Sequence, residues 1–290
     1  MRAILVFLCF IVLAYVLGAV LAYPLKLLLD SHIVLEYKKY INYATLLCGL
    51  LVSGLYLKTC SVLSSQGFGY SGTLARFVAL LTKAFFYGIA IILFIELLLL
   101  ALGIHEFDVR RAYTLEEFGI RVLKGVLSGL LISILEESIF RGGLFAGLHK
   151  QAGATLAVIV SSLLYSSVHL IRYRELPAGM EADWLTGLYM MPDAFRRFYE
   201  WSIFDYFMTL FMFGVLLALL RLRFNNIAAC IGLHAGVVAA VKTVDFYSNR
   251  TYDSQFDFLV NHYNSTFGWL SFAVILFFSL VFYFRTFAKR

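Results

Sequence analysis

The chain has 290 residues, of which 61% are hydrophobic and only 14% are charged. A soluble domain carries about 25% charged and about 45–50% apolar residues, so this composition excludes a soluble globule. The formal net charge is +6, and the Lys and Arg residues are scattered over many loops without a basic run interleaved with aromatic residues. This pattern favours membrane lipid as a partner and argues against nucleic acid.

Apolar runs long enough, or nearly so, to cross a bilayer recur along the chain. A helical crossing needs about 20 apolar residues, and such runs must be helices because an open strand edge in lipid leaves backbone groups unpaired. The sequence therefore predicts an all-α, polytopic transmembrane bundle of about eight helices. The runs lie near residues 3–23, 41–63, 77–103, 120–148, 152–170, 203–222, 224–243 and 266–287.

The first apolar run has features of both a signal peptide and a membrane helix. It extends from Ala3 to Tyr23, beyond the roughly 7–15 residues of a signal-peptide core. We interpret it as an uncleaved first transmembrane helix. The predicted location is therefore an integral, multi-pass position, in the plasma or inner membrane if the source is bacterial.

The four cysteines show no pairing or metal-binding pattern. None has a Cys-x-x-Cys partner, and most lie within apolar runs. They are predicted to be reduced packing residues. They are Cys9, Cys48, Cys60 and Cys230.

A few ionisable side chains interrupt the later apolar runs. A charge at the bilayer centre costs about 2.5–3.5 kcal/mol even on lenient insertion scales, so each such residue calls for a reason. Glu137 and Arg141 are four residues apart and can pair on one helix face. Glu136 lies about 100° around the helix from Glu137, so we expect it to meet a partner from another helix.

Two histidines in later runs, His169 and His234, are candidates to meet Glu136, and Tyr165 shares a helix face with His169. One carboxylate and two imidazoles match a zinc site with three protein ligands and an open water position. They match equally well a metal-free water that the carboxylate activates and the imidazoles hold. The sequence leaves both chemistries open, with Glu136, His169 and His234 as the ligands if a divalent metal such as zinc takes part.

Other polar and small residues have simpler interpretations. Glu96 has no motif around it and is interpreted as a helix–helix hydrogen bond or a snorkelling carboxylate. His32, His105, His149 and His262 fall in loops or at helix ends and are predicted to be solvated. Glycines in the fourth run are predicted to permit close helix packing, namely Gly125, Gly129, Gly142 and Gly143.

Four short motifs follow one another between about residues 120 and 243. Glu-Glu-x-x-x-Arg stands at Glu136–Arg141, and Tyr165–His169 matches Phe-x-x-x-His with Tyr in the first position. Phe-x-x-Gly stands at Phe211–Gly214, and His234–Val238 corresponds to His-x-x-x-Asn or Asp. At these residues the chain resembles the CAAX-protease and bacteriocin-processing (CPBP, or Abi) family of intramembrane metalloproteases, which includes the Ras-converting prenyl-protein peptidases.

The resemblance implies a four-helix catalytic core at 120–243. The apolar runs predict membrane helices before it, at 1–119, and a polar loop and a last helix after it, at 244–290. It implies an intramembrane endopeptidase that hydrolyses a peptide bond in a peptide or membrane-protein substrate. Glu136 would activate water with the help of His169 and His234, with a divalent metal or without one. Glu137 and Arg141 would orient the site, and Tyr165 would support it.

One departure from the family pattern keeps other functions open. Val238 stands where the family has Asn or Asp, and a valine side chain donates no hydrogen bond. A non-catalytic immunity or scaffold member of the family is one alternative. Independently of Val238, Glu96, Glu136 and the histidines could form the proton relay of a proton-coupled membrane carrier, although the chain shows no inverted repeat of the kind that many carriers have.

Overall fold

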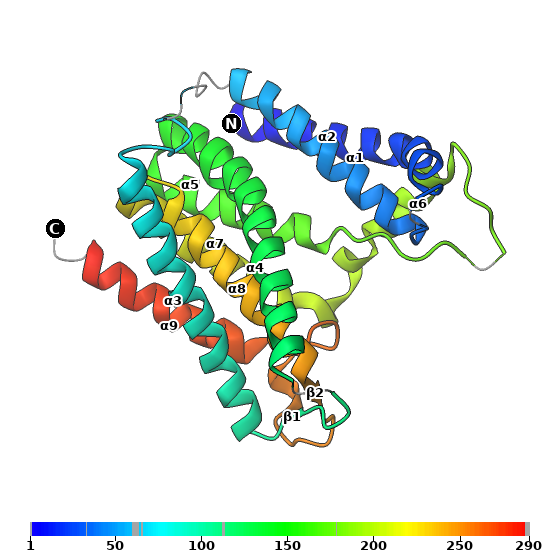
Figure 1. The fold of residues 1–290 in the computed structure, drawn as a ribbon. Coiled ribbons are helices and arrows are strands. Elements are labelled where there is room, and N and C mark those ends of the chain that lie inside the picture. The colour runs from blue at the N-terminus through cyan, green and yellow to red at the C-terminus, as the bar shows by residue number, and fades with distance from the viewer. Residues whose placement is uncertain are drawn as a thin grey trace. The chain divides into compact units, whose positions relative to one another are not determined.

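The computed structural model describes residues 2–32, 34–59, 64, 66–111, 114–177 and 179–287. Helices dominate these residues, which confirms the predicted all-α, multi-pass bundle (Figure 1). Eight helices in the described part of the chain have 18 residues or more. They are α1 (Arg2–Leu29), α2 (Tyr37–Thr59), α3 (Leu74–Ala101), α4 (Leu115–Glu137), α5 (Phe145–Leu170), α7 (Phe204–Phe224), α8 (Ala228–Tyr247) and α9 (Trp269–Thr286).

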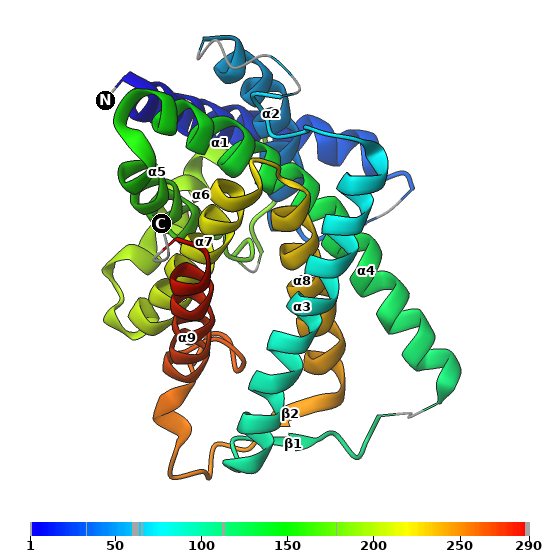
Figure 2. The same cartoon turned by 90° about the vertical axis from the view of Figure 1, so that its left-hand side faces the viewer.

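Shorter elements occupy the connections. A π-helix, η1 (Ser138–Leu144), joins α4 to α5, and the long connection before α7 contains α6 (Thr186–Ala194). Two strands, β1 (His105–Phe107) and β2 (Ser248–Arg250), pair antiparallel at one end of α3 and α8 (Figure 2). The remaining short turns are the 3₁₀ helices η2 (Arg196–Tyr199), η3 (Trp201–Ile203) and η4 (Asp257–Leu259).

Six helical stretches among the described residues are long and apolar enough to cross a membrane. One of them, Leu115–Leu170, has 56 residues and runs through α4, η1 and α5, so it is long enough for two crossings. Gly153 interrupts this stretch with a φ of 84°, a backbone conformation that glycine adopts without steric cost. The interruption lies close to the boundary expected between the runs at 120–148 and 152–170.

The chain packs as two compact units. Unit 1 contains Met1–Leu63 and Ser167–Trp201, and unit 2 contains Ser64–Ser166 and Ser202–Arg290. The predicted segments 1–119, 120–243 and 244–290 divide the chain by function in sequence order. The units are defined by packing, and they cut across those segments because α5 passes from one unit into the other.

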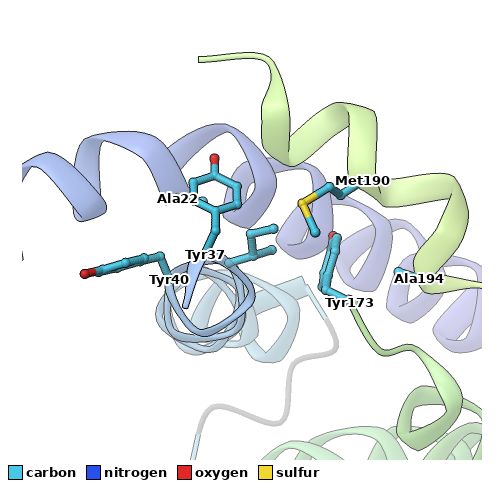
Figure 3. Close-up of a cluster of buried hydrophobic side chains, with 7 residues drawn as sticks. Ala22, Tyr37, Tyr40, Tyr173, Met190 and Ala194 are labelled. Atoms are coloured by element: carbon cyan, nitrogen blue, oxygen red, sulfur yellow. The ribbon is translucent and has the colours of Figure 1, made fainter. Parts of the chain in front are cut away.

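Unit 1 is held together by α1, α2 and α6. A Cβ atom on Gly187 of α6 would lie 2.0 Å from the carbonyl oxygen of Ala19, so glycine permits α6 to contact the backbone of α1. Buried aromatic and aliphatic side chains fill the space around these helices (Figure 3). They are Ala22, Tyr37, Tyr40, Ile41, Tyr173, Met190 and Ala194.

In unit 2, α8 lies between α3 and α4 (Figure 1). Cβ atoms on Gly232 and Gly236 would lie 2.1 and 2.0 Å from carbonyl oxygens of α3, and one on Gly129 of α4 would lie 2.6 Å from the oxygen of Ala235. Backbones this close require glycine at the contact. The packing role predicted for Gly125 and Gly129 is confirmed, because both glycines let α4 approach the backbone of α8.

The described cysteines agree with the prediction that they are reduced packing residues. Cys9, Cys48 and Cys230 are unpaired, and Cys48 and Cys230 are buried. Cys60 lies outside the described residues.

Candidate active site

The Glu-Glu-x-x-x-Arg motif runs from the end of α4 into the π-helix η1. The backbone N–H of Phe145 donates to the carbonyl oxygen of Phe140, five residues back. π-Helical turns are rare and occur often at functional sites. Because a π-helix has more residues per turn than an α-helix, it shifts the direction of every side chain that follows it. Sequence spacing predicted an ordinary helix here and gave no sign of this turn.

A buried arginine from another helix secures the π-helical segment. The Arg221 Nε atom donates to the carbonyl oxygen of Arg141 at 3.3 Å, and its Nη2 atom donates to the carbonyl oxygen of Gly67. Gly142 leaves room for Phe68, whose Cδ1 atom would lie 2.9 Å from an added Cβ. The connection before α3 and the end of α7 therefore both support the motif.

The centre of the site is a buried network of three side chains. The Arg141 Nη1 atom lies 3.3 Å from Glu137 Oε1, and His234 Nδ1 lies 2.9 Å from the same oxygen. The side chains of Glu137 and Arg141 have no exposed surface. The predicted Glu137–Arg141 pair is confirmed. A buried ion pair needs further hydrogen bonds to offset its lost hydration, and His234 supplies one of them.

Arg141 also binds a backbone carbonyl and an aromatic ring. Its Nη2 atom donates to the carbonyl oxygen of Gly214 at 3.1 Å, and its guanidinium lies 4.5 Å from the ring centroid of Tyr165. A Cβ on Gly214 would lie 3.0 Å from Ser162, so glycine brings α7 close to α5. The Phe-x-x-Gly motif thus contributes a main-chain oxygen, which side-chain chemistry alone could not reveal.

His234 is held in a fixed orientation. Its ring lies 6.1 Å from the Tyr165 ring and 5.6 Å from the Phe213 ring, in both cases edge to face. An ionised carboxylate only accepts hydrogen bonds, so with Glu137 ionised the proton of this contact lies on Nδ1. In the neutral ring Nε2 then carries the lone pair, and it is the nitrogen left to interact with water or substrate.

Two of the other predicted site residues, Glu136 and Tyr165, lie beside this network in unit 2. Glu136 precedes Glu137 and is half-buried, whereas Glu137 is fully buried. Tyr165, at 1% exposure, faces Arg141 and His234 with its ring. His169 lies in the last turn of α5, in the segment that belongs to unit 1, and its role stays a prediction.

The partner of His234 differs from the expectation that the histidines meet Glu136. Its described hydrogen bond goes to Glu137. Helical spacing places two residues of one helix on the same or different faces, but it does not say which face a second helix covers. The close packing of α8 against α4 decides that here.

A comparison with known protein families assigns this region. Residues 118–240 match the profile of the type II CAAX prenyl endopeptidase Rce1-like family. The matched stretch contains all four motifs and every residue of the buried network. Residues 118–240 are therefore similar to the CAAX protease family. No curated protein and no solved structure matches the chain.

The structure brings few possible metal donors together in this domain. Among the described residues, no group of three or more His, Cys, Asp or Glu side chains is placed to hold a metal ion. Glu137 Oε1 contacts Arg141 and His234, so these three side chains form an ion-pair network in this structure. The metal role of Glu136, His169 and His234 stays a prediction.

A second carboxylate–histidine pair lies elsewhere in unit 2. His105 Nδ1 is 2.8 Å from Glu96 Oε2, and His105 Nε2 is 3.1 Å from the carbonyl oxygen of Ser265. Both side chains are buried, so the prediction of a solvated His105 was wrong. The cause is the turn after α3, which folds β1 back against that helix and encloses a residue that the sequence places in a charged loop. Glu96 is buried and binds a strand residue, so it is neither the helix–helix hydrogen bond nor the snorkelling carboxylate that the sequence suggested.

Proposed function

We propose that this CAAX protease family member is an intramembrane endopeptidase in which Glu136 activates the hydrolytic water. The observation that carries the proposal is the Glu137–Arg141–His234 network, which lies inside the matched domain beside a second, more accessible carboxylate. The substrate class follows from the surroundings. A peptide or a membrane-protein segment within lipid is the polymer that can reach a polar site in a transmembrane bundle.

The two adjacent carboxylates suit different tasks. Glu137 is fully buried and contacts a guanidinium and an imidazole, so it is committed to orienting those groups. A general base has to reach the proton that it removes, directly or through one water. Glu136 retains partial exposure and is the carboxylate of the pair that suits this role.

His234 is suited to bind the reacting oxygen. Glu137 fixes the ring through Nδ1, so Nε2 has a set direction, and preorganised polar groups stabilise developing charge without reorganising. Protonated, His234 would donate through Nε2 to an oxyanion. Neutral, it would accept from the attacking water. This role matters more in a chain where Val238 replaces the polar residue of the family motif, because valine cannot supply that donor.

The proposed reaction conserves atoms and protons with these residues. Glu136 removes a proton from water while the water oxygen forms a bond to the peptide carbonyl carbon. The C–N bond then breaks, and the proton held by Glu136 passes to the leaving amine. His169 would assist at the water, as the resemblance implies.

The first test compares new protein N-termini in membranes that contain the full chain or its Glu136→Gln variant. The matched control is Glu116→Gln, which changes an exposed carboxylate in the first turn of the same helix. We expect products cleaved near membrane segments with the unmodified chain and with Glu116→Gln, and none with Glu136→Gln. Equal cleavage by Glu136→Gln would refute Glu136 as the base.

Val238 supports a second candidate function, that of a non-catalytic family member. Its side chain lies one turn beyond His234 in α8 and carries no hydrogen-bonding group. If the unmodified chain and Glu136→Gln are both folded and abundant and yield identical N-termini, the non-catalytic function gains support. Proton-coupled flux in liposomes would instead favour the carrier alternative.

A further inference from the structure

A groove of about 600 Å³ lies between the N-terminal half of α4 and the C-terminal part of α8, in unit 2. None of the residues that we place in the active site lines it. Its walls combine three basic side chains, two exposed leucines, a serine and a glycine. These residues are Arg121, Lys124, Lys242, Leu127, Leu131, Ser128 and Gly125.

Two of the basic side chains are held in position at this groove. The Lys242 Nζ atom of α8 donates to Ser128 Oγ of α4 at 2.8 Å, so the lysine reaches across the groove. The Arg121 Nε atom lies 2.6 Å from Glu117 Oε1, and its guanidinium lies 3.7 Å from the ring centroid of Phe246. Ordering these flexible side chains in advance lowers the entropy that a ligand must offset when it binds.

The groove has an excess of positive charge. Glu117 offsets one of the three basic groups, and the described residues give neither Lys124 nor Lys242 a carboxylate partner. Both lysines are exposed, so their ammonium groups are accessible to a ligand. The site is therefore suited to an anion with several acceptor oxygens, and phosphate groups have that chemistry.

The apolar part of the groove favours a phospholipid over a free anion as the ligand. Leu127 and Leu131 are 59% and 60% exposed and follow the basic residues along α4, toward the centre of the apolar stretch Leu115–Leu170. A free phosphate has no apolar group that could pack against these leucines. A phospholipid would place its phosphate at the lysines and an acyl chain along the leucines.

We propose that this groove binds the phosphate of an anionic lipid headgroup. Basic pockets between transmembrane helices are suited to such headgroups, and each Lys or Arg near the membrane surface contributes about 1 kcal/mol of attraction to anionic lipid. Loss of two lysines should therefore weaken binding by about 10- to 30-fold.

The test measures lipid retention by native mass spectrometry of the full chain in detergent. The lipids are dioleoyl phosphatidylglycerol and dioleoyl phosphatidylcholine. We expect the Lys124→Gln/Lys242→Gln variant to lose its preference for phosphatidylglycerol while its affinity for phosphatidylcholine stays unchanged. The matched control is Lys83→Gln/Lys150→Gln, which removes two exposed lysines outside the groove and should keep the preference.

Two further variants test the charge itself. Replacing both groove lysines by arginine should retain the preference. Glu117→Gln removes the carboxylate that pairs with Arg121 and should strengthen phosphatidylglycerol binding a few-fold. The thermal unfolding midpoint of each purified variant is measured as well. A midpoint equal to that of the unmodified chain shows that the fold is intact.

Competition with inorganic phosphate identifies the source of the anion. A lipid site should keep phosphatidylglycerol in the presence of millimolar phosphate, because the acyl chain contributes to binding. Displacement by phosphate that depends on the same two lysines would overturn the lipid assignment in favour of a soluble phosphate site. An unchanged phosphatidylglycerol preference in the Lys124→Gln/Lys242→Gln variant would overturn the proposal as a whole.

Discussion

Unit 2 contains two buried carboxylate–histidine pairs of nearly equal geometry. Glu137 and His234 meet at 2.9 Å, and Glu96 and His105 meet at 2.8 Å. Glu137 and His234 are 97 residues apart in the sequence and Glu96 and His105 only nine, and all four residues are buried. Their surroundings differ, and that difference separates a candidate active site from a structural contact.

The Glu96–His105 pair is closed on itself. The second ring nitrogen of His105 contacts the carbonyl oxygen of Ser265, so both nitrogens of the ring are used within the protein. At the other pair, the described residues give Nε2 of His234 no hydrogen-bond partner, Arg141 contributes a charge, and a half-buried Glu136 lies next in the chain. A hydrogen-bonded Glu–His pair therefore does not by itself indicate catalysis. The proposed active site differs from the Glu96–His105 pair in that Nε2 atom, in the guanidinium and in the adjacent carboxylate.

The largest expected effect is at Arg141. Arg141→Leu leaves the Glu137 carboxylate buried without its guanidinium, and breaking a buried ion pair in this way costs about 3–5 kcal/mol. We expect that loss in the free energy of unfolding, measured by SDS titration in mixed micelles. The exposed Arg76→Leu serves as control, with a change of less than about 0.5 kcal/mol. A small effect at Arg141 would mean that the buried network contributes little to stability.

Exchange of each histidine for glutamine sharpens the comparison of the two pairs. His234→Gln should lower proteolysis by about 100-fold or more, since general acid–base and preorganised groups contribute factors of that size. His105→Gln should leave cleavage within a few-fold of the unmodified chain. The measurement is the rate of substrate cleavage in liposomes, once a substrate is found from the new N-termini. Equal losses at both positions would indicate a structural role for both pairs.

A smaller effect is expected from loss of the second pair. His105→Leu leaves Glu96 without its imidazole partner, and an unsatisfied buried polar group costs about 1–3 kcal/mol. We expect faster hydrogen exchange in the turn after α3 and in β1, with the segment around Glu137 unchanged. Faster hydrogen exchange in η1 as well would contradict the independence of the two carboxylate–histidine pairs.

The smallest expected effect is a loss of local stability around Asp108 at low pH. The pKa of Asp108, beside β1, is held well below its usual value of 3.8 by hydrogen bonds from Arg110 and Asn249. Its contribution to stability is therefore complete above that value and declines as the pH falls further. Between pH 5 and pH 3, protection from hydrogen exchange at residues 105–110 and 248–252, corrected for the pH dependence of the intrinsic exchange rate, should fall more in the unmodified chain than in Asp108→Asn. The same fall in both chains would assign the acid sensitivity to other groups.

The apolar runs determined the class of fold because lipid leaves so few solutions. A 20-residue stretch without charges has to be helical in a bilayer, whatever lies next to it. Order and spacing of Glu136, Glu137, Arg141, His169 and His234 likewise sufficed to identify the family. The Glu137–Arg141 pair followed from helical spacing, since both residues belong to one helix.

Contacts between helices were decided by the tertiary structure. The partner of His234, the carbonyl of Gly214 that binds Arg141 and the burial of His105 all depend on which faces meet. In the contacts of α8, glycines bring backbones to positions where a Cβ would lie 2.0–2.6 Å from a carbonyl oxygen of the neighbouring helix. Helix periodicity gives the direction of a side chain around its own axis. The position of the neighbouring axis comes from the packing of the whole bundle, so the sequence could name the site residues but not arrange them.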